Sequence, residues 1–220
     1  MLSTKDVKGG EGSGNLPKTL KPGNVKVKIN RVELESFPLK VGAYHFVCHV
    51  ETEPIEGFVG FAIDKNDPSK GNHAGQVGKV KAGQYAYQDS ITKGGKEIKR
   101  DMEIMRHIKF LCIAVGRLDW FDAQDGKHAT IESFVEAFNN EKPFNGVYIH
   151  TCLAGKKYKN NKDYDSYDLY FAKYADGKAG FSNDPSKVVV FDEKIHITEK
   201  PVENVDNFSG GNDASADLVV

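Results

Sequence analysis

The chain has 220 residues, of which 39% are hydrophobic, enough for a buried core in one large domain or two small ones. Its formal charge is −1, from 30 basic and 31 acidic residues. Four of the acids lie in residues 203–220, so residues 1–202 carry 30 basic against 27 acidic residues, a net charge of +3. So weak a balance does not establish a polyanionic partner, because the clustering of charge matters more than its sum.

Three cysteines lie far apart, at Cys48, Cys112 and Cys152, among apolar or aromatic neighbours. Their odd number and the lack of CxxC spacing argue against a disulfide framework and a structural zinc site, so we expect buried thiols in a reducing compartment. No apolar run approaches the roughly 18 residues of a membrane span, and the N-terminus lacks the apolar core of a signal peptide. We therefore expect a cytoplasmic protein without membrane contact.

The first third of the chain predicts strands after a flexible leader. Residues 1–15 are polar and Gly-rich, as in a flexible linker. From residue 24 to residue 34, apolar and polar side chains alternate, which predicts a half-buried strand. Two further strands are expected at 43–50 and 57–64. The Gly-rich stretch 64–83 then predicts a loop, followed by a short strand at 84–87.

Two helices and three more strands are expected in the rest of the body. Apolar residues recur at steps of three and four in 98–115 and again in 130–139, before Pro143 prevents continuation. Strands are expected at 146–153, 167–174 and 187–191. Strands that flank a helical insertion indicate a β-rich α+β fold. They favour a closed or partly open antiparallel barrel over a parallel sheet with regular alternation of strands and helices.

The segment 156–174 combines five lysines with five tyrosines. Proteins that bind single strands pair cations along the backbone with aromatic rings on which bases stack, each stack contributing roughly 1–3 kcal/mol. A second group of lysines surrounds Tyr85 and Tyr87. The alternative is a Tyr-rich β-hairpin with solubilising lysines, and three aspartates within the segment weaken the electrostatic case.

The sequence gives little support for a metal site or a catalytic site. Asp119, Asp122 and Asp125 around Trp120 fall every third residue, which does not fit a calcium loop. A connector between helices with a buried Trp120 is the alternative, and Trp120 as a stacking ring is a further one. No nucleophile motif, phosphate loop or paired carboxylates are recognisable, so we expect neither an enzyme nor a metal or cofactor. A nuclease would need an unexpected geometry of these three aspartates.

Residues 203–220 contain four acids, no Lys or Arg, and the apolar end Leu218-Val219-Val220. The small residues between them offer little surface to bury, so we expect a disordered tail. Its apolar end suits docking to another protein, whereas an ordinary frayed terminus is the alternative. The residues expected to contact a protein partner are Asp213, Asp217, Leu218, Val219 and Val220.

Three runs of sequence, at 20–35, 97–112 and 119–140, resemble the single-stranded-DNA-binding proteins of bacteria and tailed phages, and in particular a phage-encoded version. The resemblance implies one OB-type barrel over residues 16–200, a groove that holds single-stranded DNA, and an acidic tail that recruits replication or recombination proteins in the host cytoplasm. The chain departs from the bacterial pattern at its end, where no aromatic residue closes the acidic run and the aromatic Phe208 lies upstream.

Together, the composition and the resemblance predict sequence-tolerant binding of single-stranded DNA in DNA replication or recombination. The alternative is a phage structural or accessory β-domain that binds no nucleic acid, and a homo-oligomer is left open. The expected phosphate contacts are Lys26, Lys28, Lys79, Lys81, Lys156, Lys157 and Lys159. The expected stacking rings are Tyr85, Tyr87, Trp120, Tyr158 and Tyr164.

Overall fold

A computed structural model describes residues 16–37, 40–161 and 163–200 of the chain. The predicted leader, residues 1–15, and the predicted tail, residues 203–220, lie outside the described residues. The partner contacts expected in the tail, Asp213, Asp217 and Leu218 to Val220, therefore stay predictions.

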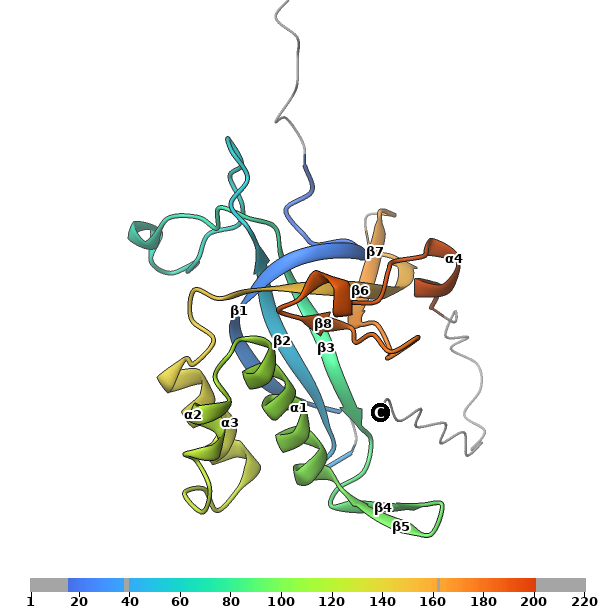
Figure 1. Ribbon diagram of the computed structural model, residues 1–220. Helices are drawn as coiled ribbons and strands as arrows, with labels where there is room; N and C mark the ends of the chain where they lie inside the picture. Colours follow the sequence, from blue (N-terminus) through green and yellow to red (C-terminus); the bar gives the residue numbers. More distant parts are fainter. Residues whose placement is uncertain (1–15, 38–39, 162, 201–220) are drawn as a thin grey trace, which may run out of the picture.

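Five strands close into a ring, β1 (Gly23–Ser36), β2 (Tyr44–Thr52), β3 (Val77–Tyr85), β6 (Tyr148–Lys159) and β7 (Asp165–Phe171). They follow one another in the order β1-β2-β3-β7-β6, and β1 pairs with β6 to complete the circle (Figure 1). The predicted β-rich class and ring closure are confirmed. The expectation of a purely antiparallel sheet is wrong at one contact of the ring, since β3 and β7 run parallel.

The long strand β1 makes the closure, because its two halves pair with different neighbours. Its first half pairs with β6, from Gly23 opposite Leu153 to Lys28 opposite Tyr148. Its second half pairs with β2, with an irregularity in register between Ile29 and Arg31. Irregularities of this kind bend a strand and increase its twist, which a closed ring requires.

Short elements complete the sheet and the connections. The strands β8 (Phe181–Ser182) and β9 (Ile197–Glu199) both pair with β6, and β9 follows the short helix α4 (Glu193–His196). The strands β4 (Ser90–Lys93) and β5 (Lys96–Lys99) form a separate two-stranded sheet. The remaining short elements are the 3₁₀ turns η2 (Pro68–Lys70) and η3 (Pro185–Lys187).

Three helices lie between β3 and β6 and cover one end of the ring (Figure 1): α1 (Arg100–Ala114), α2 (Leu118–Asp122) and α3 (Ile131–Glu141). The helices predicted at 98–115 and 130–139 are thus confirmed within about two residues at each end. Thr130 is the N-cap of α3. Its side chain accepts a hydrogen bond from the Ser133 amide, and the Ser133 hydroxyl accepts one from the Thr130 amide. This reciprocal capping gives hydrogen-bond partners to backbone amides at the start of the helix that have none within it.

The core fills the ring and continues under the helices. Inward side chains of the strands meet the apolar faces of α1 and α3, and burying each of the larger ones contributes roughly 1.5–3 kcal/mol. The largest buried side chains are Val27, Val32, Phe46, Val47, Val50, Ile104, Ile108, Leu111, Phe138, Phe144, Ile149 and Leu153.

The three thiols are buried, as predicted. Cys48 and Cys112 belong to the main core cluster, and Cys152 belongs to a smaller cluster with Val188 and Val189. Burial raises the pKa of Cys48 and of Cys112 to about 12 and that of Cys152 to about 11. The thiols are therefore protonated at neutral pH and poor nucleophiles.

Two strand predictions are wrong. Residues 57–64 belong to an irregular arm, residues 53–76, that contains one isolated bridge, between Ala62 and Asn72. The segment 187–191 begins with the last residue of η3 and forms one isolated bridge, between Val188 and Ala179, in place of a strand.

Strand β3 was largely missed, because its glycines are typical of a loop. Close packing explains why glycine stands at Gly83 and at Gly78. A side chain on Gly83 would come within 3 Å of the Tyr85 ring, and one on Gly78 would press on Leu20. The short strand predicted at 84–87 is the end of β3.

A buried hydrogen bond links β3 to α1, between the Tyr85 hydroxyl and Nδ1 of His107, which also lies 3.1 Å from the Glu103 carbonyl oxygen. Burial raises the pKa of Tyr85 and lowers the pKa of His107 from 6.5 to about 4. His107 is therefore neutral in the folded protein at neutral pH.

This burial predicts an acid-sensitive fold. The folded pKa of His107 lies below the unfolded one, so its contribution to stability is present above pH 6.5 and is lost as the pH falls to about 4. The loss amounts to about 3 kcal/mol, since one pKa unit corresponds to about 1.4 kcal/mol. His107→Asn keeps an acceptor for Tyr85 and does not titrate. Urea unfolding should show a smaller loss for this variant over that range, and identical losses would contradict the account.

Candidate nucleic-acid interface

A groove of about 330 Å³ lies on the outer surface where β3 meets β7. The parallel contact between these strands has two registered pairs, Val80 with Leu169 and Lys81 with Tyr170. The pairing of β3 with β7 is therefore short. We call this site the β3–β7 groove. The polar and aromatic side chains that line it are Glu35, Lys79, Lys81, Tyr158, Tyr167 and Asp168.

Strand alternation explains why two lysines reach the groove. Val80 is fully buried on the inner face of β3, so Lys79 and Lys81, its neighbours in the sequence, point outward. Tyr158 of β6 is opposite Ser166 of β7, and Tyr167 of β7 is opposite Lys157 of β6, so the two rings start from opposite faces of this strand pair, although both line the groove. The fold thus brings the predicted residues Lys79, Lys81 and Tyr158 together.

Carboxylates compensate part of the positive charge of the groove lysines. The Lys79 ammonium lies 3.2 Å from a Glu35 oxygen and 3.8 Å from a Glu33 oxygen. Lys81 forms no ion pair within the part of the chain that the structure describes. One lysine of the groove is therefore already engaged by acids, while its neighbour is available to an anion.

Glu33 is the centre of a small charged cluster beside the groove. Its Oε2 lies 2.6 Å from Nε2 of His49 and 3.2 Å from the Arg31 guanidinium. The hydrogen bond from His49 lowers the pKa of Glu33, and Lys79 and Arg31 lower it further. Burial lowers the pKa of His49, although its bond to Glu33 opposes this. At neutral pH the cluster holds an ionised carboxylate next to a neutral imidazole.

The opposite lip of the groove carries Tyr158 and three lysines. The ammonium of Lys200 lies 5.1 Å from the centre of the Tyr158 ring and 3.3 Å from Asp168. Lys157 and Lys159 both contact Asp165, at 3.1 and 2.9 Å, and their hydrogen bonds lower the pKa of this carboxyl. The Lys200 ammonium thus covers one of the two faces of the Tyr158 ring.

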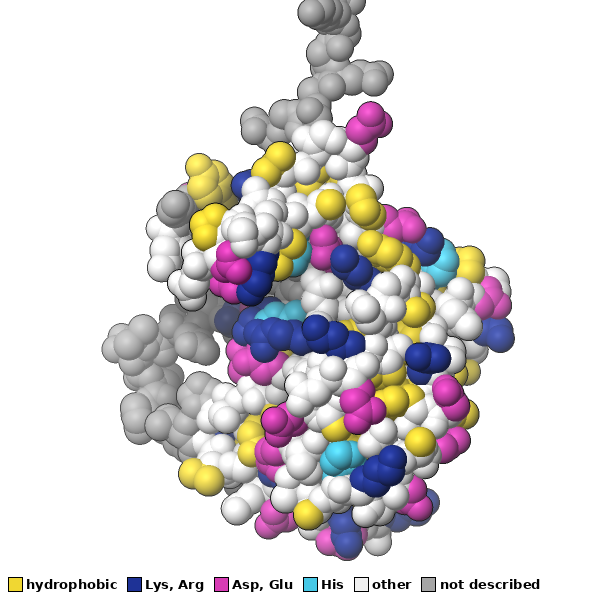
Figure 2. All heavy atoms as spheres, turned by 90° about the vertical axis from the view of Figure 1, so that its left-hand side faces the viewer, with side chains coloured by type: hydrophobic (Ala, Val, Ile, Leu, Met, Phe, Trp, Pro, Cys, Tyr) yellow, Lys and Arg dark blue, Asp and Glu magenta, His cyan; other side chains and the backbone are white. Residues whose placement is uncertain are grey.

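Other predicted contacts lie away from the groove. Lys26 and Lys28, on the outer face of β1, pair with Glu53 at 2.7 Å and with Glu51 at 3.2 Å. Figure 2 shows how charges of both signs mix on one face of the molecule, where a row of Lys and Arg side chains runs between acidic ones. Such a face is close to neutral overall.

Two predicted residues are exposed on or near the β6–β7 hairpin. Lys156 lies on β6 and is exposed, and Tyr164, in the connection from β6 to β7, is 68% exposed. Tyr164 is the only predicted stacking ring in the described residues that is both strongly exposed and close to a groove strand.

Three stacking predictions are corrected by the structure. Tyr85 is 4% exposed, and the Tyr87 ring packs on the core with its hydroxyl buried. Trp120 donates a hydrogen bond of 2.6 Å from Nε1 to Glu141, and its ring centre lies 5.3 Å from that of Phe138. Tyr85 is thus buried, while Tyr87 and Trp120 are half-buried rings that pack on the core, and Trp120 lies on α2 itself.

Some groove residues were missed. Tyr167 was counted in the Tyr-rich segment but not selected, and Glu33 and Glu35 were overlooked. Simple alternation would put Glu33 and Glu35 on the face opposite to Lys26 and Lys28. The irregular register between Ile29 and Arg31 shifts the alternation by one residue and brings these acids and lysines onto the same face.

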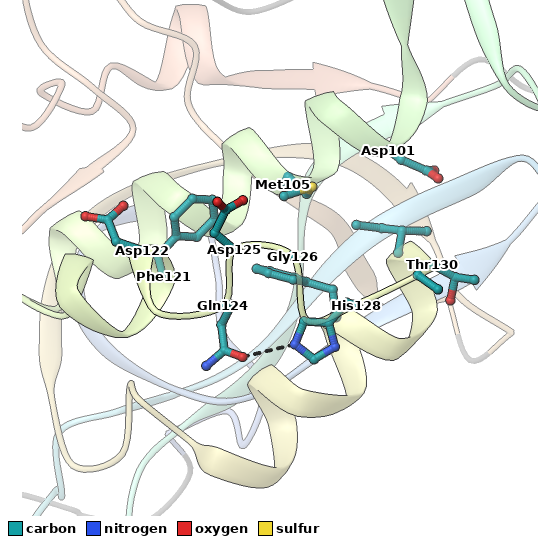
Figure 3. Close-up of a pocket in the computed structure, with 12 residues that line it drawn as sticks. Asp101, Met105, Phe121, Asp122, Gln124, Asp125, Gly126, His128 and Thr130 are labelled. Atoms are coloured by element: carbon teal, nitrogen blue, oxygen red, sulfur yellow. Dashed lines mark hydrogen bonds between the residues drawn. The ribbon is translucent and has the colours of Figure 1, made fainter.

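A second cavity, of about 450 Å³, lies between α1 and the connection from α2 to α3 (Figure 3). Asp122 and Asp125 lie at one side of it and Asp101 at the other, while Gln124 and His128 are joined by a hydrogen bond of 3.0 Å. Within the described residues, no three His, Cys, Asp or Glu side chains are grouped to hold a metal ion.

Comparisons with known proteins add no relative: no family model matches the chain, and neither a curated protein nor a solved structure matches it significantly. Among the described residues, no helix is both long and apolar enough to cross a membrane. The function must therefore be inferred from the residues and their geometry.

Proposed function

We propose that the ring is an OB-type barrel that binds single-stranded DNA, without sequence preference, in the β3–β7 groove. An OB fold is a partly open five-stranded barrel that binds oligonucleotides over its second and third strands. The present groove lies over β3 and extends to Val47 of β2. The observation that carries the proposal is the convergence of two lysines and two tyrosines from β3, β6 and β7 on one groove.

The chemistry suits a flexible polyanion with exposed bases. Lys79 and Lys81 provide cations for phosphates, and Tyr158 and Tyr167 provide rings for bases. A duplex keeps its bases stacked inside and offers such rings nothing to bind. Binding of this kind needs no cofactor, metal or catalytic step, so we do not propose an enzyme.

The carboxylates beside the lysines set the strength of binding. A phosphate that approaches Lys79 has to replace Glu33 and Glu35, whose oxygens lie within 4 Å of its ammonium. Exposed ion pairs of this type are individually weak, about 0–1 kcal/mol each, so the exchange is feasible. The groove therefore combines moderate affinity with ready release.

The resemblance of the chain to phage proteins extends the proposal to DNA replication or recombination in the host cytoplasm, with the acidic tail as the contact for protein partners. Lys200, the last described residue, contacts Asp168 and Tyr158, which line the groove.

A protein-binding accessory role is the second candidate. It is favoured by an exposed apolar group on the 53–76 arm, where Phe61 is 45% exposed and Val59 and Ile63 are more so. Exposed patches of this kind mark interaction surfaces. A lack of nucleic-acid binding would leave this role in place.

Fluorescence anisotropy with labelled dT oligomers and a matched duplex tests the proposal. The full chain should prefer the single strand, and Lys79→Ser/Lys81→Ser should reduce the slope of log affinity against log salt by about 1.4, since each phosphate contact contributes about 0.7. Lys127→Ser, in the connection from α2 to α3, is the matched control and should leave the slope unchanged. Equal affinity for single strand and duplex would refute the proposal.

The role of the carboxylates gives a second prediction, of opposite sign. Glu33→Gln/Glu35→Gln should tighten binding of dT oligomers about three- to tenfold, because two weak competitors of up to about 1 kcal/mol each are removed. Glu53→Gln, which releases Lys26 outside the groove, is the matched control. Weaker binding by the double variant would show that these acids support the site.

A further inference from the structure

The hairpin of β4 and β5 stands apart from the barrel. It follows β3 and projects beyond the start of α1 at the helical end of the molecule (Figure 1). Its turn is Gly94-Gly95, with φ of 57° and 76°, the left-handed values that a tight two-residue hairpin turn requires. Nothing lies within 4 Å of the positions that side chains would occupy on these two glycines.

The hairpin has almost no core. Ile91 and Ile98 face each other in register and are half-buried, while the other residues from 90 to 99 are exposed. Two-stranded hairpins are marginal in water unless something packs against them. Its base is held where the Arg100 amide donates to the Asp89 carbonyl.

The hairpin carries three lysines against one acid, Glu97. Lys93 and Lys96 lie directly opposite each other next to the turn. Like charges in this cross-strand arrangement destabilise a sheet. An anion bound beside Lys96 would reduce this repulsion.

Lys99 occupies a position where a lysine lowers the stability of a helix. It occupies the N-cap position of α1 and makes no capping hydrogen bond from its side chain. Ser, Thr, Asp and Asn are preferred there because their oxygens pair open amides, and a cation opposes the helix dipole. Lysines on exposed strands can serve to prevent edge-to-edge aggregation, but that explanation does not extend to a helix cap.

We propose that the β4–β5 hairpin is a second phosphate-binding surface for the strand that occupies the β3–β7 groove. The proposal rests on the proposed function and extends it. Lys79 and Lys81 lie on β3, which leads directly to the base of the hairpin, so a strand that follows β3 toward the helical end reaches Lys96 and Lys99. Neither of these two lysines forms an ion pair in the described parts of the chain, whereas Lys79 does.

The test uses Lys96→Thr/Lys99→Ser in the full chain. Threonine suits a strand and serine caps a helix, so this variant should unfold at a higher temperature than the parent protein. Its binding of dT oligomers should nevertheless weaken, with the salt slope reduced by about 1.4 and a smaller occluded site on poly(dT). Glu97→Gln is the matched control within the hairpin and should not reduce the slope.

Each outcome has one meaning. Higher stability together with a reduced slope supports the phosphate surface. An unchanged slope in a variant whose parent binds dT oligomers overturns the hairpin proposal and leaves the groove intact. A parent protein that binds no single strand overturns both. If sedimentation shows that the variant loses self-association while its slope is unchanged, the hairpin binds protein and the proposal is wrong.

Discussion

The pairing of β1 with both β2 and β6 is the constraint on which the molecule depends. Through this pairing the sheet closes into a ring of five strands, and β7 is brought beside β3 in the parallel contact that forms the groove. The irregular register between Ile29 and Arg31 lets one strand serve both neighbours. Without this closure Tyr158 and Tyr167 would not meet Lys79 and Lys81.

Charge is distributed unevenly over the resulting surface. On the barrel, most of the expected phosphate contacts are matched by acids on neighbouring strands, as for Lys26, Lys28 and Lys79. On the β4–β5 hairpin, lysines face each other and one of them occupies a helix cap. The lysines of the barrel are thus largely compensated, while Lys96 and Lys99 on the hairpin form no ion pair among the described residues.

The sequence predicted those parts of the fold whose pattern is local. The helical stripe of α1 and the alternation of β1 depend on neighbouring residues, so both were found. Lys79 and Lys81 were expected in a loop, and strand alternation places them on one face only because this stretch is part of β3. Ring closure could not be derived in this way, because it joins segments such as those of Asn24 and Thr151, 127 residues apart.

The stacking rings failed for a different reason. The sequence does not show whether the ring of an aromatic residue in a strand points toward the core or toward solvent. The Tyr85 ring points into the core, next to His107. Glycines concealed β3 because the need for close packing at Gly83 arises from Tyr85, a contact visible only in the fold. Charge compensation likewise depends on cross-strand register, which composition does not contain.

The most direct test of the central claim is a map of amide chemical shifts in the ¹H–¹⁵N spectrum during titration with a dT oligomer. The account predicts the largest changes at Lys79 to Lys81, Tyr158 and Tyr167, with little change in α2 and α3. Changes confined to the 53–76 arm or to the cavity beside α2, with the groove residues unmoved, would contradict it.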